Sequence, residues 1–390
     1  MNNHKPFAAV LAALALAAAP VAGAEPVRIG MITTLSGGGS ALGVDVRDGF
    51  MLAVGDDDTL GGVPVEVLIE DDARDTSRSR EAAQRMIQRE QVSIFTGTIW
   101  SNLALATVPR ILAADGLFLS PNAGPAEFAG SDCHPGYFNV AWQNDNLHEA
   151  MGQYVNDEGY DNVYLVAPNY PAGRDALEGF KRYYQGDIAG ELNTSLGQQD
   201  YASELATIRN ADPEAVFFFL PGGMGVNFLR QYDQAGMRDS IPLYGPAFSF
   251  DEAILEAAGS AAEGAINGAQ WSPDLDNAAN REFVEAFQAK YDRRPSLYAS
   301  QGYDTARLLA SALAAVDGDI SDMQALRAAV READFESVRG DFRFNTNQHP
   351  IQDIHVRRVV PAEGGGHTNE LVGMAFPEHR DAYVGDCAME

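Results

Sequence analysis

Two successive blocks of alternating strand and helix patterns constrain the fold of this chain more than any other feature. The first block runs from the β-rich segment at 27–34 to the segment LFLS at 117–120. After Asn146 the pattern restarts, with strands predicted from 162–168 to 215–221 and helices between them. Alternation of this kind produces parallel sheets whose faces are covered by helices. The restart predicts an α/β protein with two similar lobes.

The length of the chain supports this division. A single hydrophobic core usually stops growing at about 250–300 residues, and this chain has 390. Its last third is less regular: helical patterns at 277–291 and 298–315 precede a hairpin-like stretch at 338–350 and a β-rich run at 354–360. We expect these late elements to return to the two lobes already begun.

The N-terminus has the pattern of a secretory signal. Lys5 supplies a positive start, an apolar run follows at 7–21, and the small residues at 22–24 end it. The apolar run is shorter than the roughly 20 residues that a membrane-spanning helix needs. We therefore expect residues 1–24 to be removed, the mature chain to begin at Glu25, and the protein to be periplasmic. An N-terminal core helix is the alternative.

The formal net charge of −28 limits the possible partners. An acidic surface repels nucleic acid and anionic lipid head groups, and it favours solubility. We therefore expect no nucleic-acid partner. The charge carries no information about the fold.

The chain contains two cysteines, Cys133 and Cys387. An even count in an oxidising compartment favours a disulfide bond between them, and two buried thiols are the alternative. A metal site is not expected, because the histidines are scattered and none is spaced from a cysteine as metal ligands are.

The sequence lacks the motifs of several enzyme classes. We find no G-x-S-x-G around a serine, no H-E-x-x-H and no G-x-x-x-x-G-K. His148, His349 and His355 have no nucleophile within motif range. We therefore expect no catalytic residues and no cofactor.

Three turns between a strand and a helix carry the candidate binding groups. They lie at 36–43 (SGGGSALG), 97–102 (GTIWSN) and 120–124 (SPNAG). In open α/β sheets, ligands bind at the carboxyl ends of the strands, where such turns gather. Helix capping by serine and asparagine is the alternative explanation for 97–102.

Two other features near the first turn have ordinary explanations. Gly37, Gly39 and Gly43 do not match the G-x-G-x-x-G spacing of dinucleotide sites, so this turn either holds an anion at a helix start or is simply tight. Asp71 and Asp72 follow a predicted strand and could hold a cation, but paired acids in this position are more often solvated or helix-capping.

Seven stretches in order resemble one known family. They are IGMITTLSG, VEVLIEDDARD, GTIWSN, LSPNAG, PNYPAG, GPAF and YASQGYDTARLLASAL. Across nearly the whole mature chain they resemble the leucine/isoleucine/valine-binding branch of periplasmic substrate-binding proteins. The resemblance implies the type I periplasmic binding fold: two Rossmann-like lobes with parallel sheets, joined by a three-strand hinge.

The resemblance also implies lobe boundaries and a role. Hinge crossings are expected near Ala141, Gln270 and Arg343, with lobe 1 formed by 25–141 plus 271–343 and lobe 2 by 142–270 plus 344–390. The family consists of solute-binding proteins of ABC importers, which close around a ligand and deliver it to a permease in the inner membrane. A monomer without enzymatic activity is expected.

Ligand-binding positions carry over from the family residue by residue. The serine that receives the ligand carboxylate corresponds to Ser101, and the next turn contributes Asn122 and Ala123. Tyr170 matches an aromatic residue of the second lobe, and Tyr298 one of the side-chain pocket. The full set of candidate ligand-binding residues is Ser40, Leu42, Thr98, Trp100, Ser101, Asn102, Asn122, Ala123, Tyr170, Gly222, Phe248 and Tyr298.

One departure from the family bears on the ligand. Amino-acid binders have an acidic residue for the ligand ammonium in the turn that contains Ala247 here. A buried ammonium without a partner costs several kcal/mol. Phe248 and Phe250, unless they are only core residues, favour a flat apolar ligand body together with Trp100.

The chain also resembles an aromatic-acid-binding subgroup of this family, through TGTIWSN, ASQGYDTA and the cysteine near the C-terminus. This implies a benzoate-like or phenylpropenoid carboxylate as the ligand. A branched-chain amino acid or amide is the alternative ligand, and a ligand-sensing partner of a membrane receptor is the alternative role. A periplasmic hydrolase that uses Ser101 is a further alternative.

Overall fold

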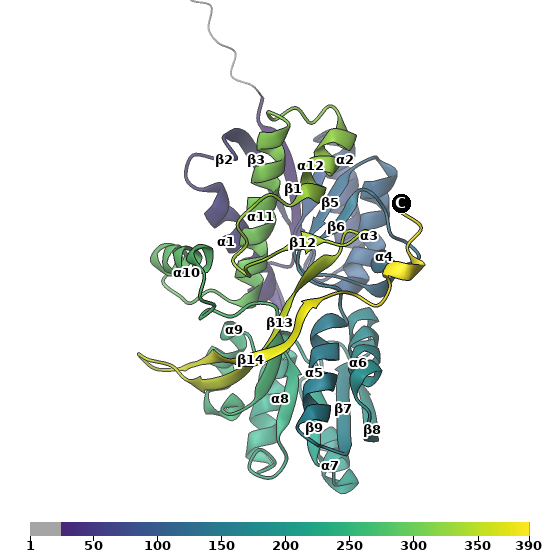
Figure 1. Ribbon diagram of the computed structural model, residues 1–390, viewed down its shortest axis with the longest axis vertical. Helices are drawn as coiled ribbons and strands as arrows, with labels where there is room; N and C mark the ends of the chain where they lie inside the picture. The colour runs from purple at the N-terminus through teal and green to yellow at the C-terminus, as the bar shows by residue number, and fades with distance from the viewer. Residues whose placement is uncertain (1–24, 390) are drawn as a thin grey trace, which may run out of the picture.

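The structure is a computed structural model, and it describes residues 25–389. It contains two α/β lobes, one above the other in Figure 1, each built around one sheet. The predicted signal segment at 1–24 lies outside the described residues. Within them, the predicted two-lobed α/β fold is confirmed.

Lobe 1 is built on a six-stranded sheet with the order β2-β3-β1-β4-β5-β6. All pairs are parallel except β2 with β3. The strands are β1 (Val27–Thr33), β2 (Thr59–Leu60), β3 (Val63–Asp71), β4 (Ile94–Thr96), β5 (Leu117–Ser120) and β6 (Tyr137–Asn139). The helices of this lobe are α1 (Ser40–Val54), α2 (Thr76–Arg89), α3 (Ser101–Ala113), α4 (Ala126–Ala129), α11 (Leu297–Ala315) and α12 (Met323–Glu332).

Two separate cores cover the two faces of this sheet. Helices α1, α11 and α12 bury side chains against one face, and α2 and α3 bury theirs against the other. Helices α1 and α11 cross closely, because a Cβ on Gly49 would lie 1.9 Å from the carbonyl oxygen of Ala299 and one on Gly302 would lie 2.0 Å from that of Val46. This close crossing places the N-terminal turns of both helices beside the cleft between the lobes.

Lobe 2 is built on a second sheet with the order β12-β13-β11-β10-β9-β7-β8, and β14 pairs with β13. Strands β7 to β11 are parallel, whereas β12, β13 and β14 pair antiparallel. The strands are β7 (Asn162–Pro168), β8 (Asp187–Thr194), β9 (Ala215–Phe218), β10 (Leu243–Pro246), β11 (Ile266–Ala269), β12 (Arg343–Phe344), β13 (Pro350–Pro361) and β14 (His367–His379). The helical elements are α5 (Asn146–Asp157), α6 (Pro171–Tyr183), α7 (Ala202–Ala211), α8 (Gly223–Gln234), η1 (Ala247–Ser249), α9 (Glu252–Ala258) and η2 (Gly259–Ala262). Helix α10 (Ala278–Tyr291) follows the second crossing and packs on α1 of lobe 1.

Three stretches of chain pass between the lobes, and the first and third of them are joined by hydrogen bonds at Ala141. The first follows β6, the second follows β11, and the third is the start of β13. The carbonyl oxygen of Ala141 accepts hydrogen bonds from Arg339 at 3.1 Å and from Gln352 at 2.7 Å. Arg339 also pairs with the buried carboxylate of Asp304 at 2.9 Å. This polar cluster joins the first and third crossing segments to α11.

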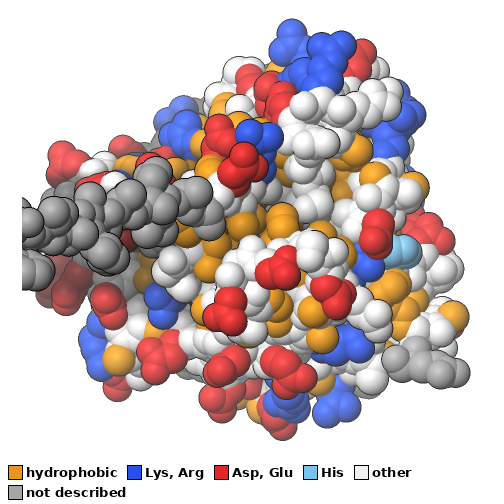
Figure 2. Space-filling view, turned by 90° about the horizontal axis from the view of Figure 1, so that it is seen from above, with side chains coloured by type: hydrophobic (Ala, Val, Ile, Leu, Met, Phe, Trp, Pro, Cys, Tyr) orange, Lys and Arg blue, Asp and Glu red, His pale blue; other side chains and the backbone are white. Residues whose placement is uncertain are grey.

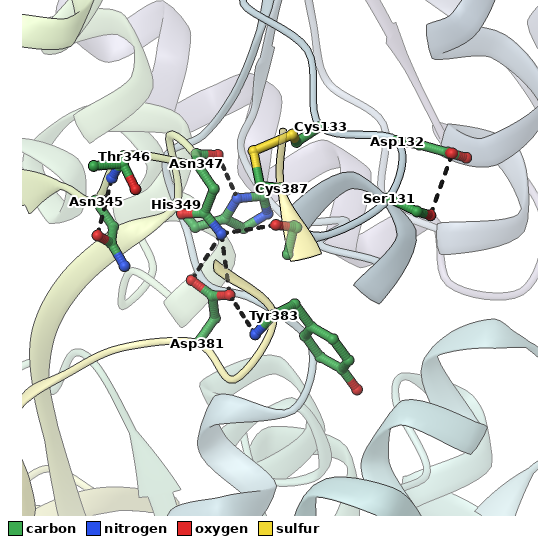
Figure 3. Close-up of a disulfide and its surroundings, with 11 residues drawn as sticks. Ser131, Asp132, Cys133, Asn345, Thr346, Asn347, His349, Asp381, Tyr383 and Cys387 are labelled. Atoms are coloured by element: carbon green, nitrogen blue, oxygen red, sulfur yellow. Dashed lines mark hydrogen bonds between the residues drawn. A yellow bond between two sulfur atoms is a disulfide. The ribbon is translucent and has the colours of Figure 1, made fainter. Parts of the chain in front are cut away.

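The last residues return to lobe 1. Residues after β14 include the short helix η3 (Val384–Asp386), and Cys387 bonds to Cys133 with a Cα–Cα distance of 5.6 Å. Figure 3 shows this disulfide beside Asn347, which donates to Asp381 and to the carbonyl oxygen of Ala129. The disulfide predicted from the cysteine count is therefore present. The predicted boundaries assigned 344–390 to lobe 2, whereas this tail is held against lobe 1 by the disulfide.

The surface carries charges of both signs. Seen from the lobe 1 end, acidic and basic side chains are interspersed with hydrophobic ones (Figure 2). The predominance of acidic residues in the composition therefore does not produce a uniformly acidic face at this end.

Candidate ligand-binding site

A cavity lies between the two lobes. The lining residues come from both lobes and from the first crossing segment: Leu42, Ile99, Trp100, Ser101, Asn122, Ala123, Trp142, Asn144, His148, Tyr170, Ala172, Phe219, Pro221, Phe248 and Tyr298.

The cavity lies where several strands of both sheets end. The turns after β4 and β5 supply its lobe 1 wall, and the turns after β7, β9 and β10 supply its lobe 2 wall. The carboxyl ends of parallel strands are the usual ligand site of open α/β sheets. The lobes also touch beside the cavity, because a Cβ on Gly222 would lie only 3.6 Å from Cα of Gly39.

Two helix N-termini face the cavity, one from each lobe. Helix α3 begins at Ser101, and α6 begins at Pro171 with Ala172 as its second residue. Neither helix has a side chain that caps its first N–H groups. Unsatisfied N–H groups and the helix dipole make such a terminus favourable for an anion. Helices α3 and α6 also contact each other, so we expect their two N-termini to favour an anion in the same part of the cavity.

The Ser101 hydroxyl lines the cavity and has an unused donor. Its oxygen accepts a hydrogen bond from Nδ2 of Asn144 at 3.1 Å. A serine hydroxyl has one donor and two acceptor sites, and within residues 25–389 the Ser101 hydroxyl donates to no protein acceptor. The buried hydroxyl group is therefore free to donate to a ligand.

Asn144 connects this serine to lobe 2. The same Nδ2 donates to Oδ2 of Asp175, on α6, at 2.7 Å. Burial raises the pKa of Asp175 to about 7, and the negative charge of Asp145 adds to the effect. Because the unfolded carboxyl has a pKa near 3.8, the folded protein retains this proton while the unfolded chain releases it. The Asp175 contribution to the free energy of unfolding therefore falls as the pH rises from about 4 to 7.

Asp175→Asn should remove this pH-dependent contribution. The amide oxygen can still accept from Asn144, so the variant should be more stable than wild type at pH 8, by the order of 1–4 kcal/mol. The difference in the free energy of unfolding between the variant and wild type should be smaller at pH 5. Urea unfolding at the two pH values measures both differences. An advantage that does not change with pH would contradict the assignment of a raised pKa to Asp175.

Aromatic rings form a continuous wall around the cavity. Ring centroids are 6.2 Å apart for Trp100 and Tyr170, 6.2 Å for Tyr170 and Phe219, and 5.6 Å for Phe219 and Phe248. Trp142 packs on Phe248 at 4.3 Å. Such a wall buries a flat apolar group well, because aromatic pairs favour tilted and offset contacts at these distances.

The glycine-rich turn and the paired acids position Trp100. Its indole N–H donates to Thr34 at 3.0 Å, and the Thr34 hydroxyl donates to Asp72 at 2.6 Å. Gly39 has a positive φ of 93°, and a Cβ there would lie 2.5 Å from the Trp100 ring. Asp71 accepts from the N–H groups of Leu35 and Ala73. Both acids therefore join their own loop to the loop after β1. No cluster of metal-ligating side chains occurs within residues 25–389.

The groups that line the cavity are neutral near pH 7. None of them is Asp, Glu, Lys or Arg. Burial lowers the pKa of His148 to about 3, and it raises the pKa of Tyr170 and Tyr298 above the usual value for a tyrosine. An anion in this cavity would consequently be held by neutral donors and helix termini.

Eight of the twelve predicted ligand-binding residues line the cavity: Leu42, Trp100, Ser101, Asn122, Ala123, Tyr170, Phe248 and Tyr298. Ser40, Thr98, Asn102 and Gly222 lie in the same turns or helix starts but are not among the lining residues. Direct ligand contact by any of the twelve stays a prediction.

Sequence reasoning missed seven lining residues: Ile99, Trp142, Asn144, His148, Ala172, Phe219 and Pro221. Three of them, Trp142, Asn144 and His148, follow the first crossing between the lobes. The polar and aromatic run at 142–148 was a usable signal, because it directly follows a predicted hinge crossing.

A match to the profile of a known protein family shows which family this chain belongs to. A profile described as periplasmic binding protein matches residues 26–366. This chain belongs to that family. As a member of the periplasmic binding protein family, it is a solute-binding component of an ABC transporter and not an enzyme. No helix among residues 25–389 is long and apolar enough to cross a membrane.

Curated relatives of this periplasmic binding protein include a Leu/Ile/Val-binding protein homologue from Brucella melitensis. It is 25% identical over 91% of this chain and 93% of its own length. Another Leu/Ile/Val-binding protein homologue, from Brucella abortus, is 23% identical to this chain, over 90% of each of the two chains.

Solved structures in this family superpose closely. A solute-binding protein from R. palustris in complex with benzoate has a TM-score of 0.88 and 29% identity, covering 93% of this chain and all of its own. Another, from Rhodopseudomonas palustris BisB5 in complex with 3,4-dihydroxybenzoic acid, has a TM-score of 0.83 and 26% identity over 91% of this chain and 98% of its own. A third, from Sphaerobacter thermophilus, has a TM-score of 0.84 and 31% identity over the same fractions.

Proposed function

We propose that this protein captures a small aromatic carboxylate, of the benzoate or phenylpropenoid class, between its lobes. The observation that carries the proposal is the division of the cavity into two parts. The Ser101 hydroxyl and the starts of α3 and α6 form a part that favours an anion, and the rest is a largely aromatic wall without Asp, Glu, Lys or Arg.

The neutral wall disfavours an amino acid. An α-amino acid brings an ammonium group, whose burial without a partner costs several kcal/mol. Ala247 is buried and offers no charge. The nearby acid Asp251 does not line the cavity, and one of its carboxylate oxygens caps α9 through the N–H groups of Ala253 and Ile254.

Two relatives support an aromatic acid. The R. palustris proteins in complex with benzoate and with 3,4-dihydroxybenzoic acid are more than 25% identical to this chain and cover more than nine-tenths of it. The names of the Brucella relatives favour a branched-chain amino acid as the second candidate ligand.

Closure of the lobes would complete the site. Ser101 and Asn122 belong to lobe 1, whereas Tyr170 and Phe248 belong to lobe 2, so the two sets meet only when the lobes are together. A ligand that contacts both lobes shifts the protein toward this closed form. The exported, loaded protein would then dock on an ABC permease in the inner membrane and release the ligand there, without covalent chemistry.

A thermal-shift panel on the chain from Glu25 tests the proposal. Benzoate, hydroxybenzoates and cinnamate-type acids should raise the melting temperature, because a ligand that binds only the folded state stabilises it. Leucine, isoleucine and valine at the same concentration should not. Stabilisation by the branched-chain amino acids without any effect of the aromatic acids would overturn the proposal.

A further inference from the structure

His148 is a polar group of the cavity that the carboxylate site does not use. It lies in the first turn of α5, it lines the cavity, and it is 1% exposed. Its Nδ1 is buried without a hydrogen-bond partner. Within residues 25–389, neither of its ring nitrogens makes a hydrogen bond to another protein group.

Aromatic rings surround this imidazole. Its ring centroid lies 5.1 Å from that of Phe219, 5.7 Å from that of Phe217 and 5.8 Å from that of Phe248. A phenylalanine at this position would keep an aromatic ring among these neighbours. The burial that lowers its pKa keeps the imidazole neutral, so it carries one N–H donor and one acceptor nitrogen.

A buried polar group without a partner is costly. Leaving such a donor or acceptor unsatisfied costs about 1–3 kcal/mol, and most buried polar side-chain atoms in proteins have a partner. The Phe217, Phe219 and Phe248 rings offer none. The imidazole borders the cavity, so a polar atom of a ligand could satisfy it there.

The position of His148 fits the far end of an aromatic acid. Asn144, which donates to the Ser101 hydroxyl, lies in the turn before α5, whereas His148 lies in the first turn of that helix. The rings packed around His148 all belong to lobe 2. His148 therefore lies on the lobe 2 side of the cavity, among the rings that would hold the aromatic body.

We propose that His148 is a specificity-determining residue that hydrogen-bonds a hydroxyl group on the ring of the bound acid. The preferred ligands are then hydroxylated benzoates rather than benzoate itself. This inference rests on the proposed function. The physical basis is that a site with a hydrogen-bonding group disfavours the analogue that leaves the group unpaired.

Calorimetric titration of wild type and His148→Phe with benzoate, 3-hydroxybenzoate and 4-hydroxybenzoate tests the proposal. Wild type should bind one hydroxybenzoate at least about 5-fold more tightly than benzoate. His148→Phe should lose about 5- to 100-fold in affinity for that hydroxybenzoate, and its affinity for benzoate should change by less than about 3-fold. Phe248→Leu is the matched control, because loss of a wall contact should weaken all three acids by a similar factor.

A measurement on the wild-type protein gives the same test if His148→Phe does not fold. The ring ¹⁵N resonances of His148, assigned with His148→Gln, should shift on binding of the preferred hydroxybenzoate and change little on binding of benzoate. Equal shifts for both acids would overturn the proposal.

The two proposals fail in different ways. If no aromatic acid binds wild type, the proposed function is wrong. If the acids bind but wild type does not distinguish them, or if His148→Phe weakens benzoate and hydroxybenzoates equally, then only the role of His148 is wrong.

Discussion

Replacing Ser101 with alanine should weaken the binding of benzoate or a hydroxybenzoate by about 10- to 100-fold. The reason is that a hydrogen bond to a charged group contributes about 1.5–3 kcal/mol. The Ser101 hydroxyl is buried, receives one hydrogen bond from Asn144 and has its own proton free for the carboxylate. Binding should not be abolished, because the N-termini of α3 and α6 remain. Calorimetric titration measures the change.

Ser300→Ala is the matched control for this variant. Ser300 is equally buried, but its hydroxyl donates to the carbonyl oxygen of Leu297 in its own helix, and it does not line the cavity. Its replacement should change the dissociation constant by less than about 2-fold, since it removes no ligand contact. An equal effect of the two variants would show that Ser101 acts through stability and not through the carboxylate.

Loss of the disulfide should produce the largest change in stability. The bond joins residues 254 positions apart in sequence, and cross-links that close long loops typically contribute about 2–5 kcal/mol. It fastens the C-terminal tail beside the buried bonds that Asn347 makes to Asp381 and to Ala129 (Figure 3). The double variant Cys133→Ser/Cys387→Ser should therefore unfold at a lower urea concentration.

Ligand binding separates this effect from damage to the site. Neither cysteine lines the cavity, so the double variant should bind the preferred acid with nearly wild-type affinity at a temperature where it is folded. Reduction of the wild-type protein should reproduce the loss of stability. An unchanged unfolding midpoint, both in the variant and after reduction, would contradict a stabilising role for the bond.

Local patterns in the sequence were sufficient for most of the fold. The β-rich runs at 27–34 and 162–168 became interior strands of the two sheets, as their nearly continuous burial indicates. Strand β14 was not predicted. Its side chains are largely exposed or half-buried, and it is stabilised mainly by antiparallel pairing with β13, which no local pattern shows.

The lobe 1 wall of the site was easier to predict than the lobe 2 wall. Ser101 and Asn122 lie in turns whose small and polar residues are visible in the sequence. Phe219 was hidden at the end of an apolar strand pattern, and His148 lies in a helix. Whether Phe219 and His148 reach the cavity depends on how the two lobes pack together, and no local sequence pattern shows this.

A crystal structure of the protein with the acid that stabilises it most would test the central claim most directly. We expect the carboxylate to lie within hydrogen-bond distance of the Ser101 hydroxyl and of N–H groups at the starts of α3 and α6, with the ring between Tyr170, Phe219 and Phe248. A carboxylate bound elsewhere, or a ligand outside this cavity, would contradict the account.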